Sequence, residues 1–523
     1  MAPDVPASGK VGKVYLVGAG PGDPRLITVR GVECLRQADL VVYDRLASPE
    51  LLGHAPERAE RIFVGKGPRQ HTMTQDEINA LLVERGLAGL NVVRLKGGDP
   101  YVFGRGGEEA MALEQAGIPF EVVPGITSSI AGPSFAGIPV SHRHVASSFA
   151  VVTGHEDPAR EGSAIRWAGL ANGPDTLIFL MGVEHLESIV DNLLRHGRPL
   201  DQPVAAIRWA TTPEQEVVAG TLRTIVELVR GAKLRPPAVL VVGDVVGLRA
   251  ALDWRGRLPL AGLRVLVTRA RQQASALSSR LVELGAVPLE YPTIEIRPAD
   301  DPAPFDAALR DITSFGWIVF TSTNGVDAFW ERLLATGQDA RSLAASSVCA
   351  IGPSTAAALA AHGLTADWMP REFVTDSILD GFRAYDLAGV RVLLARADIA
   401  PPLVADGLRD QGALVTEITA YRTVPSDESR TRLISALEQR TIDVVTLTSS
   451  STARNLVDGI GGRLDLLHGL TVASIGPVTS RTARELGLTV HVEAEVHTIP
   501  GLVDSLLAWA ASHPHREPFA GSG

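Results

Sequence analysis

A glycine-rich segment near the start of the chain is the first candidate for chemistry. VGAGPGDP, residues 17–24, follows an apolar stretch and precedes a helical one, and Asp44 ends the next apolar stretch. In a dinucleotide-binding unit such a turn holds the pyrophosphate, and a carboxylate about twenty residues later binds the ribose. However, Asp23 stands where the third glycine belongs, and Pro21 lacks a backbone N–H. The spacing therefore argues against a nicotinamide-dependent oxidoreductase, which NADH binding would support.

Further motifs in the first half combine glycine with charged and hydroxyl side chains. In chain order they are VYDR (42–45), VGKG (64–67), RLKGGDPYVFGRGGEE (94–109), VVPGITSS (122–129), GIPVSHR (137–143), FLMGV (179–183) and IRWATTPEQ (207–215). Adjacent glycines let backbone N–H groups approach a ligand closely. Aspartate accepts hydrogen bonds from an amine or from ribose hydroxyls, and threonine and serine supply short donors. These motifs predict a binding site for a small polar ligand.

The second half has hydroxyl-rich turns instead of a recognisable nucleophile or metal motif. TSTNG (321–325) and TSSST (448–452) each follow an apolar stretch, whereas GPST (352–355) and GPVT (476–479) place proline at a helix start. Free N–H groups at a helix start hold carboxylates, although such turns alone also serve as ordinary helix caps. Taken alone, these turns are interpreted as helix caps, with carboxylate binding at the helix starts as the alternative.

Alternating strand and helix patterns position these motifs. The first half begins with a strand at 14–18, a helix at 26–38 and a strand at 40–44, and similar units continue to about residue 250. The polar segment LDWRGRLPLAG, residues 252–262, interrupts the pattern before RVLVTRA begins a new strand at Arg264. We therefore expect two α/β domains with a boundary in this segment.

An internal duplication organises the second half. RVLVTRA at Arg264 and RVLLARA at Arg391 lie 127 positions apart, as do Ser322 and Ser449 in the two hydroxyl-rich turns. The GPST and GPVT motifs lie 124 positions apart. A period of this length is too long for a solenoid and suits two copies of a small α/β lobe. We expect a ligand cleft between these lobes.

Composition limits the class of protein. The 523 residues are 45% hydrophobic with a net charge of -10, which excludes a disordered chain and disfavours nucleic acid as a partner. An anionic small substrate is still compatible with a local cluster of arginines. The two cysteines, Cys34 and Cys349, are expected to be buried small hydrophobes. No membrane span, no signal peptide and no metal site are expected, and the protein is expected to be cytoplasmic.

With its motifs in this order, the region from residue 12 to about 250 resembles the uroporphyrinogen-III C-methyltransferases. The resemblance implies S-adenosylmethionine as the methyl donor and uroporphyrinogen III as the acceptor, methylated twice to precorrin-2. It also implies two α/β subdomains and a homodimer formed through the first half. The implied cofactor contacts are Pro21, Gly97, Gly98, Asp99, Val102, Thr127, Ser128, Met181 and Ala210.

The same resemblance suggests roles for charged residues. Asp44 matches the position of a base that removes a proton after methyl transfer, and Lys66 matches a second group that either transfers a proton or binds a substrate carboxylate. Five basic side chains in or beside the motifs are expected to pair with the acetate and propionate groups of the substrate. They are Arg45, Arg94, Lys96, Arg105 and Arg143.

The second half resembles uroporphyrinogen-III synthase through VLVTRA, VFTSTNGV, AIGPST, ITAYRT and HTIPGLVDSLL. The resemblance implies ring closure of hydroxymethylbilane with inversion of the last pyrrole, without a cofactor. Tyr421 matches the side chain most often implicated, as a donor to the leaving hydroxyl, and a buried structural tyrosine is the alternative. Ser322, Ser449 and Thr479 are expected to contact the substrate.

Together the two resemblances predict a fusion of consecutive activities. The expected division is a disordered tail (1–11), the methyltransferase (12–252), a linker (253–261), the synthase (262–510) and a second tail (511–523). Within the synthase, lobe one takes 262–297 and 425–510, and lobe two takes 298–424. An alternative is that only the methyltransferase half is active, with the second half as a binding or regulatory module.

Overall fold

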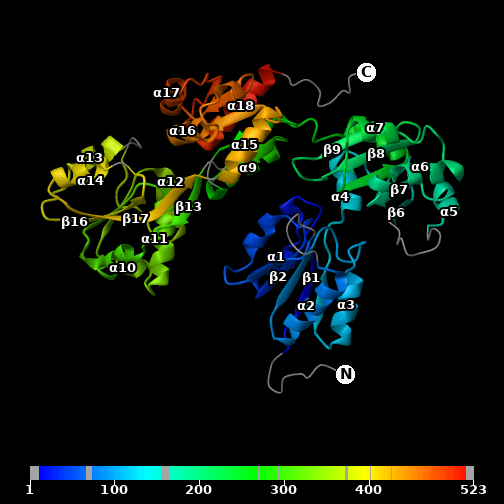
Figure 1. Ribbon diagram of the computed structural model, residues 1–523, viewed down its shortest axis with the longest axis horizontal. Coiled ribbons are helices and arrows are strands. Elements are labelled where there is room, and N and C mark those ends of the chain that lie inside the picture. The colour runs from blue at the N-terminus through cyan, green and yellow to red at the C-terminus, as the bar shows by residue number, and fades with distance from the viewer. Residues whose placement is uncertain are drawn as a thin grey trace. The chain divides into compact units, whose positions relative to one another are not determined.

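The computed structural model describes residues 11–65, 73–154, 165–268, 271–291, 294–370, 375–400, 402–425 and 427–513. It divides into two compact units, one formed by Met1–Gly262 with Val282–Val287 and the other by Leu263–Leu281 with Pro288–Gly523. Within these residues, each unit contains two sheets of five strands. Figure 1 shows the helices and strands of both units. Both units are α/β, as the sequence predicts.

The first sheet of the first unit is parallel and has the order β3-β2-β4-β1-β5. Its strands are β1 (Val14–Gly18), β2 (Leu40–Tyr43), β3 (Glu60–Phe63), β4 (Val92–Lys96) and β5 (Phe120–Val123). They alternate with α1 (Val29–Arg36), α2 (Gln75–Leu87) and α3 (Gly106–Gln115). Parallel strands are covered on both faces, which explains why β4 is buried along its whole length.

The helix predicted at 26–38 is shorter in the structure. The glycine-rich turn leads into a 3₁₀ turn at Pro24–Leu26, and α1 begins only after Thr28. The Thr28 hydroxyl accepts a hydrogen bond from Gly31 N at 3.1 Å, which caps the helix at this point. The glycine-rich segment therefore does not point a long helix at a bound pyrophosphate.

The second sheet of this unit is mixed, with the order β6-β7-β10-β8-β9. Its strands are β6 (Phe149–Thr153), β7 (Thr176–Leu180), β8 (Pro203–Arg208), β9 (Glu216–Thr221) and β10 (Ala238–Val242). Its helices are α4 (Ser128–Phe135), α5 (Trp167–Asn172), α6 (Leu186–Arg195) and α7 (Ile225–Gly231), followed by α8 (Arg249–Leu252). The expectation of uniform strand-helix units is wrong here, because the short turn 209–215 returns the chain so that β9 pairs antiparallel with β8.

In the second unit, one sheet has the order β12-β11-β18-β19-β20. Its strands are β11 (Arg264–Val267), β12 (Val287–Glu290), β18 (Val444–Leu447), β19 (Thr471–Ser474) and β20 (Val492–Glu493). The helices of this part of the chain are α9 (Arg271–Glu283), α15 (Asp427–Glu438), α16 (Ser450–Gly459), α17 (Pro477–Glu485) and α18 (Ile499–Ser512).

The other sheet of this unit has the order β13-β17-β16-β14-β15. Its strands are β13 (Ile294–Pro298), β14 (Trp317–Phe320), β15 (Ser347–Ala350), β16 (Arg391–Ala397) and β17 (Leu414–Pro425). The helices in this stretch are α10 (Ala303–Arg310), α11 (Thr323–Ala335), α12 (Pro353–Ala361), α13 (Thr375–Phe382) and α14 (Leu403–Asp410). Because β13 pairs with β17, the chain changes sheets between β12 and β13, a few residues before the boundary predicted at 297.

The sequence duplication reappears as equivalent elements in these two sheets. Adjacent strands β11, β18 and β19 correspond to β16, β14 and β15, in the same spatial order and with the same parallel pairing. Ser322 and Ser449 each cap the helix that follows, and each side chain accepts a hydrogen bond from the backbone N–H three residues later. The repeated motifs therefore mark repeated strand-to-helix turns.

Both cysteines are buried, as predicted, with 2% of Cys34 and none of Cys349 exposed. Burial raises the pKa of the Cys349 thiol to about 12 and also raises that of Cys34. Since the thiolate is the reactive form, we expect neither cysteine of the native protein to react with a thiol reagent at about pH 8. A time course with and without denaturant checks this, and rapid labelling of the native protein would contradict it.

Across the described ranges, no helix is both long and apolar enough to cross a membrane.

Candidate active sites

Three glycine-containing turns meet at the carboxyl ends of β1, β4 and β5. Gly98 N donates to Gly20 O at 2.7 Å, and Gly20 N donates back to Gly98 O at 3.2 Å. A Cβ added to Gly18 would lie 2.4 Å from the Gly125 Cα, and one added to Gly125 would lie 2.1 Å from Gly98 O. Only glycine permits such close approach of backbones. The result is a set of closely packed backbone turns, of which Gly98 and Gly125 are partly exposed, at the edge of the sheet where α/β proteins bind ligands.

Asp99 fastens two of these turns together. One carboxylate oxygen accepts a hydrogen bond from Gly125 N at 3.0 Å, and the other accepts from Tyr101 N at 2.8 Å. The same carboxylate was predicted to bind the cofactor. In the structure it also shapes the site, because it holds the glycine turn after β4 against the turn after β5.

Several other predicted cofactor residues lie around the glycine turns. A Cβ on Gly98 would lie 3.8 Å from Thr127 Cα and 3.9 Å from Ser128 N, so these residues are neighbours. Thr127 caps α4 and its hydroxyl lies 3.0 Å from that of Ser129. The peptide oxygen of Ala210 lies 3.2 Å from a Cβ placed on Gly22, beside the first glycine-rich loop.

The other residues that were predicted to contact the cofactor have different neighbours. Val102 packs against the apolar cluster that contains Ala210 and Leu180. Met181 follows β7 in a left-handed conformation with φ of 57° and is 49% exposed. Gly97 lies against Leu46, and Pro21 is half-buried in the glycine-rich loop.

Asp23, which interrupts the dinucleotide fingerprint, has a structural role. Its side chain is 7% exposed and forms an ion pair of 2.7 Å with Arg25, and its backbone N donates to the Thr211 hydroxyl at 3.0 Å. Thr211 N in turn donates to Gln215 at 2.9 Å. These contacts fasten the glycine-rich loop to the turn 209–215, which connects β8 and β9 in the second sheet of the first unit. The carboxylate is therefore an anchor for the loop.

The segment predicted as a linker begins as a packed part of the first unit. The Arg255 guanidinium donates to Thr212 O at 3.1 Å and lies 5.6 Å from the centre of the Phe135 ring. Trp254 packs edge-on against the same ring at 5.3 Å and donates to Ser134 O. Burial lowers the pKa of Arg255. These contacts join α4, which carries Thr127 at its start, to the turn that carries Ala210.

Arg255→Ala is expected to lower the free energy of unfolding by about 1–3 kcal/mol, because it removes a partly buried hydrogen bond to Thr212 and the contact with Phe135. Chemical denaturation of the full chain measures this. Arg257→Ala is the matched control, because Arg257 is exposed and donates to the nearby carbonyls of Ala250 and Ala251, so the expected change is within about 0.5 kcal/mol. Equal effects of the two substitutions would contradict a special role for Arg255.

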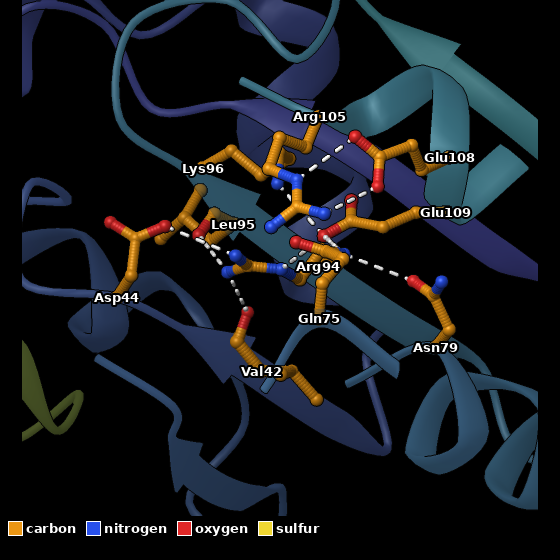
Figure 2. A network of polar contacts seen from close by, with 10 residues as sticks. All are labelled: Val42, Asp44, Gln75, Asn79, Arg94, Leu95, Lys96, Arg105, Glu108 and Glu109. Atoms are coloured by element: carbon orange, nitrogen blue, oxygen red, sulfur yellow. Dashed lines mark hydrogen bonds and ion pairs between the residues drawn. The ribbon is translucent and has the colours of Figure 1, made fainter. Parts of the chain in front are cut away.

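The Asp44 carboxylate lies directly after β2 at the same edge of the sheet. One oxygen accepts from Leu46 N at 3.0 Å, and the other pairs with the Arg94 guanidinium at 3.2 Å (Figure 2). The Asp44 side chain is 24% exposed. A carboxylate that is oriented by two donors and still reachable is suited to accept a proton from a bound molecule.

Behind Asp44 the structure corrects the prediction for two of the basic residues. Arg94 and Lys96 are each 3% exposed, and both pair with the fully buried carboxylate of Glu109, at 3.2 Å and 2.8 Å. Burial, followed by the nearby Arg94 charge, lowers the pKa of Lys96. In this structure both cations are therefore enclosed and paired with Glu109 inside the protein. Glu109 was not among the residues predicted from the sequence, although it belongs to the motif FGRGGEE that also contains the predicted site residue Arg105.

The other predicted substrate contacts differ in their surroundings. Arg45 and Arg143 are exposed, and Arg105 is exposed and paired with Glu108 at 2.6 Å. Arg105 stands at the start of α3 with φ of 59°, a strained conformation for a residue with a side chain. Lys66 lies outside the described residues.

In the second unit, Tyr421 and Ser322 form one site. Tyr421 lies on β17, is 7% exposed, and its hydroxyl is 3.1 Å from the Ser322 hydroxyl. The Ser322 hydroxyl also accepts from Gly325 N at 3.0 Å, at the start of α11. The phenol is therefore held at a helix start, where N–H groups favour an anionic ligand.

The equivalent turn of the other sheet carries Ser449 and Thr479. Ser449 caps α16, and its hydroxyl lies 2.9 Å from that of Ser451. Thr479 is 4% exposed in the first turn of α17. A hydrogen bond of 2.9 Å from Thr482, in α17, to Ser450, at the start of α16, links the two helices. Ser449 and Thr479 therefore lie at the starts of two neighbouring helices, whereas Tyr421 reaches Ser322 from within β17.

Comparison with known families defines the class of each half. A family model described as tetrapyrrole (corrin/porphyrin) methylases matches residues 13–226, and one described as uroporphyrinogen-III synthase HemD matches residues 275–504. The porphyrin biosynthesis protein HemD of Ruminiclostridium josui is 38% identical over 95% of this chain and 98% of its own length. The uroporphyrinogen-III C-methyltransferase of Priestia megaterium is 51% identical over 45% of this chain and 99% of its own.

The chain belongs to the tetrapyrrole methylase family in its first half and to the uroporphyrinogen-III synthase HemD family in its second half. It therefore carries a methyltransferase domain and a synthase domain, which confirms both sequence resemblances. Among solved structures, the uroporphyrin-III C-methyltransferase of Thermus thermophilus with S-adenyl homocysteine is 42% identical. It covers 45% of this chain and 100% of that chain, with a TM-score of 0.40.

Proposed function

We propose that the chain is a bifunctional enzyme that cyclises hydroxymethylbilane to uroporphyrinogen III and then methylates uroporphyrinogen III twice to precorrin-2. The product of the second half is the substrate of the first half, so the two reactions are consecutive. The observation that carries the methyltransferase assignment is the Asp44 carboxylate, oriented and partly exposed beside the converging glycine turns.

S-adenosylmethionine is the proposed methyl donor, which supplies an electrophilic methyl group on a sulfonium. A relative from Methanosarcina barkeri, 51% identical over 47% of this chain and 96% of its own length, is an S-adenosyl-L-methionine-dependent uroporphyrinogen III methyltransferase. The fit to this chain comes from the bare peptide groups of Gly97 and Gly98 and from the hydroxyls at Thr127 and Ser128, with Ala210 nearby. These groups suit the polar adenosine and amino acid portions of such a molecule.

The methyl acceptor is proposed to lie over Asp44. Exposed Arg45, Arg105 and Arg143 would pair with its acetate and propionate groups. As the new carbon–carbon bond forms at the ring, the carbon–sulfur bond of the donor breaks. Asp44 then accepts the proton that leaves the macrocycle. Lys66 remains a candidate for a second proton transfer or for carboxylate binding.

For the synthase half, the proposed reaction is loss of water from hydroxymethylbilane and ring closure with inversion of the last pyrrole. Tyr421 would donate a hydrogen bond to the leaving hydroxyl, with Ser322 holding the phenol. Ser449 and Thr479 would contact substrate carboxylates at neighbouring helix starts. A homodimer formed through the first half is part of the same proposal, and sedimentation or light scattering tests it.

Anaerobic incubation with hydroxymethylbilane, with and without S-adenosylmethionine, tests both activities. We expect type III uroporphyrin after oxidation of the reaction without the methyl donor, and a dimethylated precorrin-2 chromophore with it. Type I isomer alone would show that the second half is not a working synthase and would favour the binding-module alternative. Methylation fed directly with uroporphyrinogen III tests the first half separately. Tight binding of NADH would instead support the alternative of a nicotinamide-dependent oxidoreductase.

Tyr421→Phe is expected to lower the rate of type III formation by about tenfold to a hundredfold, because the phenol no longer donates to the leaving group. The control is Tyr385→Phe, since Tyr385 is a 40% exposed tyrosine of the same unit that packs on Trp317 through its ring. We expect wild-type rates for that control. A rate unchanged by Tyr421→Phe would show that the tyrosine is only a packing residue.

A further inference from the structure

We infer that Arg94 is a positioning residue for methyl transfer, whose guanidinium, anchored by the fully buried Glu109, fixes the Asp44 carboxylate in its working orientation. This inference rests on the proposed function, because that function gives Asp44 its role as a base. It adds Arg94 and Glu109, which are 3% and 0% exposed and act through Asp44.

The Arg94 guanidinium uses its three nitrogens in different directions. Nε donates to Glu109 at 3.2 Å, Nη2 donates to Asp44 at 3.2 Å, and Nη1 donates to the carbonyls of Val42 and Leu95 at 3.4 and 3.1 Å (Figure 2). The two carbonyls belong to neighbouring strands β2 and β4. The group that faces Asp44 is therefore held on every side by rigid elements, which is the arrangement that preorganises a catalytic side chain.

Glu109 acts as the anchor. A single oxygen, Oε1, accepts from Arg94, from Lys96 at 2.8 Å and from Gln75 at 3.3 Å, while Oε2 is buried with no hydrogen-bond partner in the described part of the chain. A buried carboxylate with one unsatisfied oxygen is an expensive arrangement. This cost is explained by a role for Glu109 in holding the two cations Arg94 and Lys96 at fixed positions close to Asp44.

The four ion-paired side chains Arg94, Lys96, Glu109 and Asp44 balance in charge, and Asp44 is the member nearest the surface. Two cations, Arg94 and Lys96, face two carboxylates, of which Glu109 is 0% and Asp44 is 24% exposed at the side chain. Only Asp44 of these four therefore reaches the surface of the unit appreciably. A purely structural ion cluster has no need of an exposed member, whereas a device that presents one carboxylate to a ligand does.

Arg94→Lys tests the inference. Lysine keeps the positive charge but lacks the planar guanidinium, whose separate N–H groups bind Glu109 and Asp44 at the same time. With uroporphyrinogen III as the methyl acceptor, we expect kcat to fall at least about tenfold. The KM for uroporphyrinogen III and the Kd for S-adenosylhomocysteine should stay within about twofold of wild type. Should this variant fail to fold, the charge-balanced pair Glu109→Gln with Lys96→Met removes the anchor instead, and the same fall in kcat is expected.

A matched control and a double-mutant cycle separate positioning from stability. Arg198→Met removes another partly buried arginine, which donates to the carbonyls of Ala171, Pro174 and Asp175. It should lower the melting temperature without lowering kcat. In an Asp44→Asn background, Arg94→Lys should reduce kcat less than about twofold further, because Arg94 acts through Asp44.

Each outcome is decisive. Wild-type kcat in Arg94→Lys, or full additivity with Asp44→Asn, would overturn the inference and leave the proposed function standing. A wild-type protein that does not methylate uroporphyrinogen III would overturn both.

Discussion

Asp44→Asn is expected to reduce methyl transfer to uroporphyrinogen III by about a hundredfold to ten-thousandfold, which is the largest loss of activity we predict. Asparagine has nearly the same shape and its amide oxygen still accepts from either Leu46 N or Arg94, but it does not take up a proton. Because the side chain is 24% exposed, the cost to folding should be small. Methylation rates under single-turnover conditions, with S-adenosylhomocysteine binding measured in parallel, check both statements.

The matched control is Asp39→Asn. Asp39 lies just before the other end of β2, is partly buried, and its carboxylate also accepts a backbone hydrogen bond, from Asn91 N at 3.0 Å. Its replacement should leave the methylation rate unchanged. If Asp44→Asn retains more than about a tenth of the wild-type rate, another group accepts the proton and Asp44 only supports the structure of the site.

Local patterns made much of the fold predictable. Apolar runs such as VYLVG and LVVY read as buried parallel strands, and both occur as β1 and β2. The hydroxyl-rich turns at Ser322 and Ser449 read as helix caps, and both side chains cap the helices that follow. These features depend on residues within a few positions of one another, so a sequence contains the necessary information.

The contacts between distant segments were not predictable in the same way. Arg94 and Lys96 were predicted to bind substrate carboxylates, whereas in the structure both pair with Glu109, which α3 brings close to β4. Asp23 appeared as a failed glycine position, whereas its contact with Thr211 spans 188 positions. Arg255 sits in a segment with linker composition, yet it packs on Phe135. Each case needs tertiary structure to pair a charge with its partner.

Gly125→Ala is expected to lower the free energy of unfolding by about 1–3 kcal/mol or more and to weaken S-adenosylhomocysteine binding at least about tenfold. The added Cβ would lie 2.1 Å from Gly98 O and 2.6 Å from Gly18 Cα, and both are backbone atoms that no side-chain rotation can move aside. To relieve the overlap, the turn after β5 must separate from the turn after β4. That movement breaks the bond from Gly125 N to Asp99 and spreads the peptide groups proposed to hold the methyl donor.

Gly169→Ala provides the comparison within the same unit. Gly169 lies in α5, a Cβ there would have no atom within 4 Å, and alanine is the better helix former. We therefore expect unchanged or slightly higher stability and unchanged ligand binding for this variant. Calorimetric titration with S-adenosylhomocysteine and denaturant unfolding of both proteins distinguish the two positions. If Gly125→Ala binds and unfolds like Gly169→Ala, the close approach of the three turns is not needed for the site, and its ligand must be held elsewhere in the first unit.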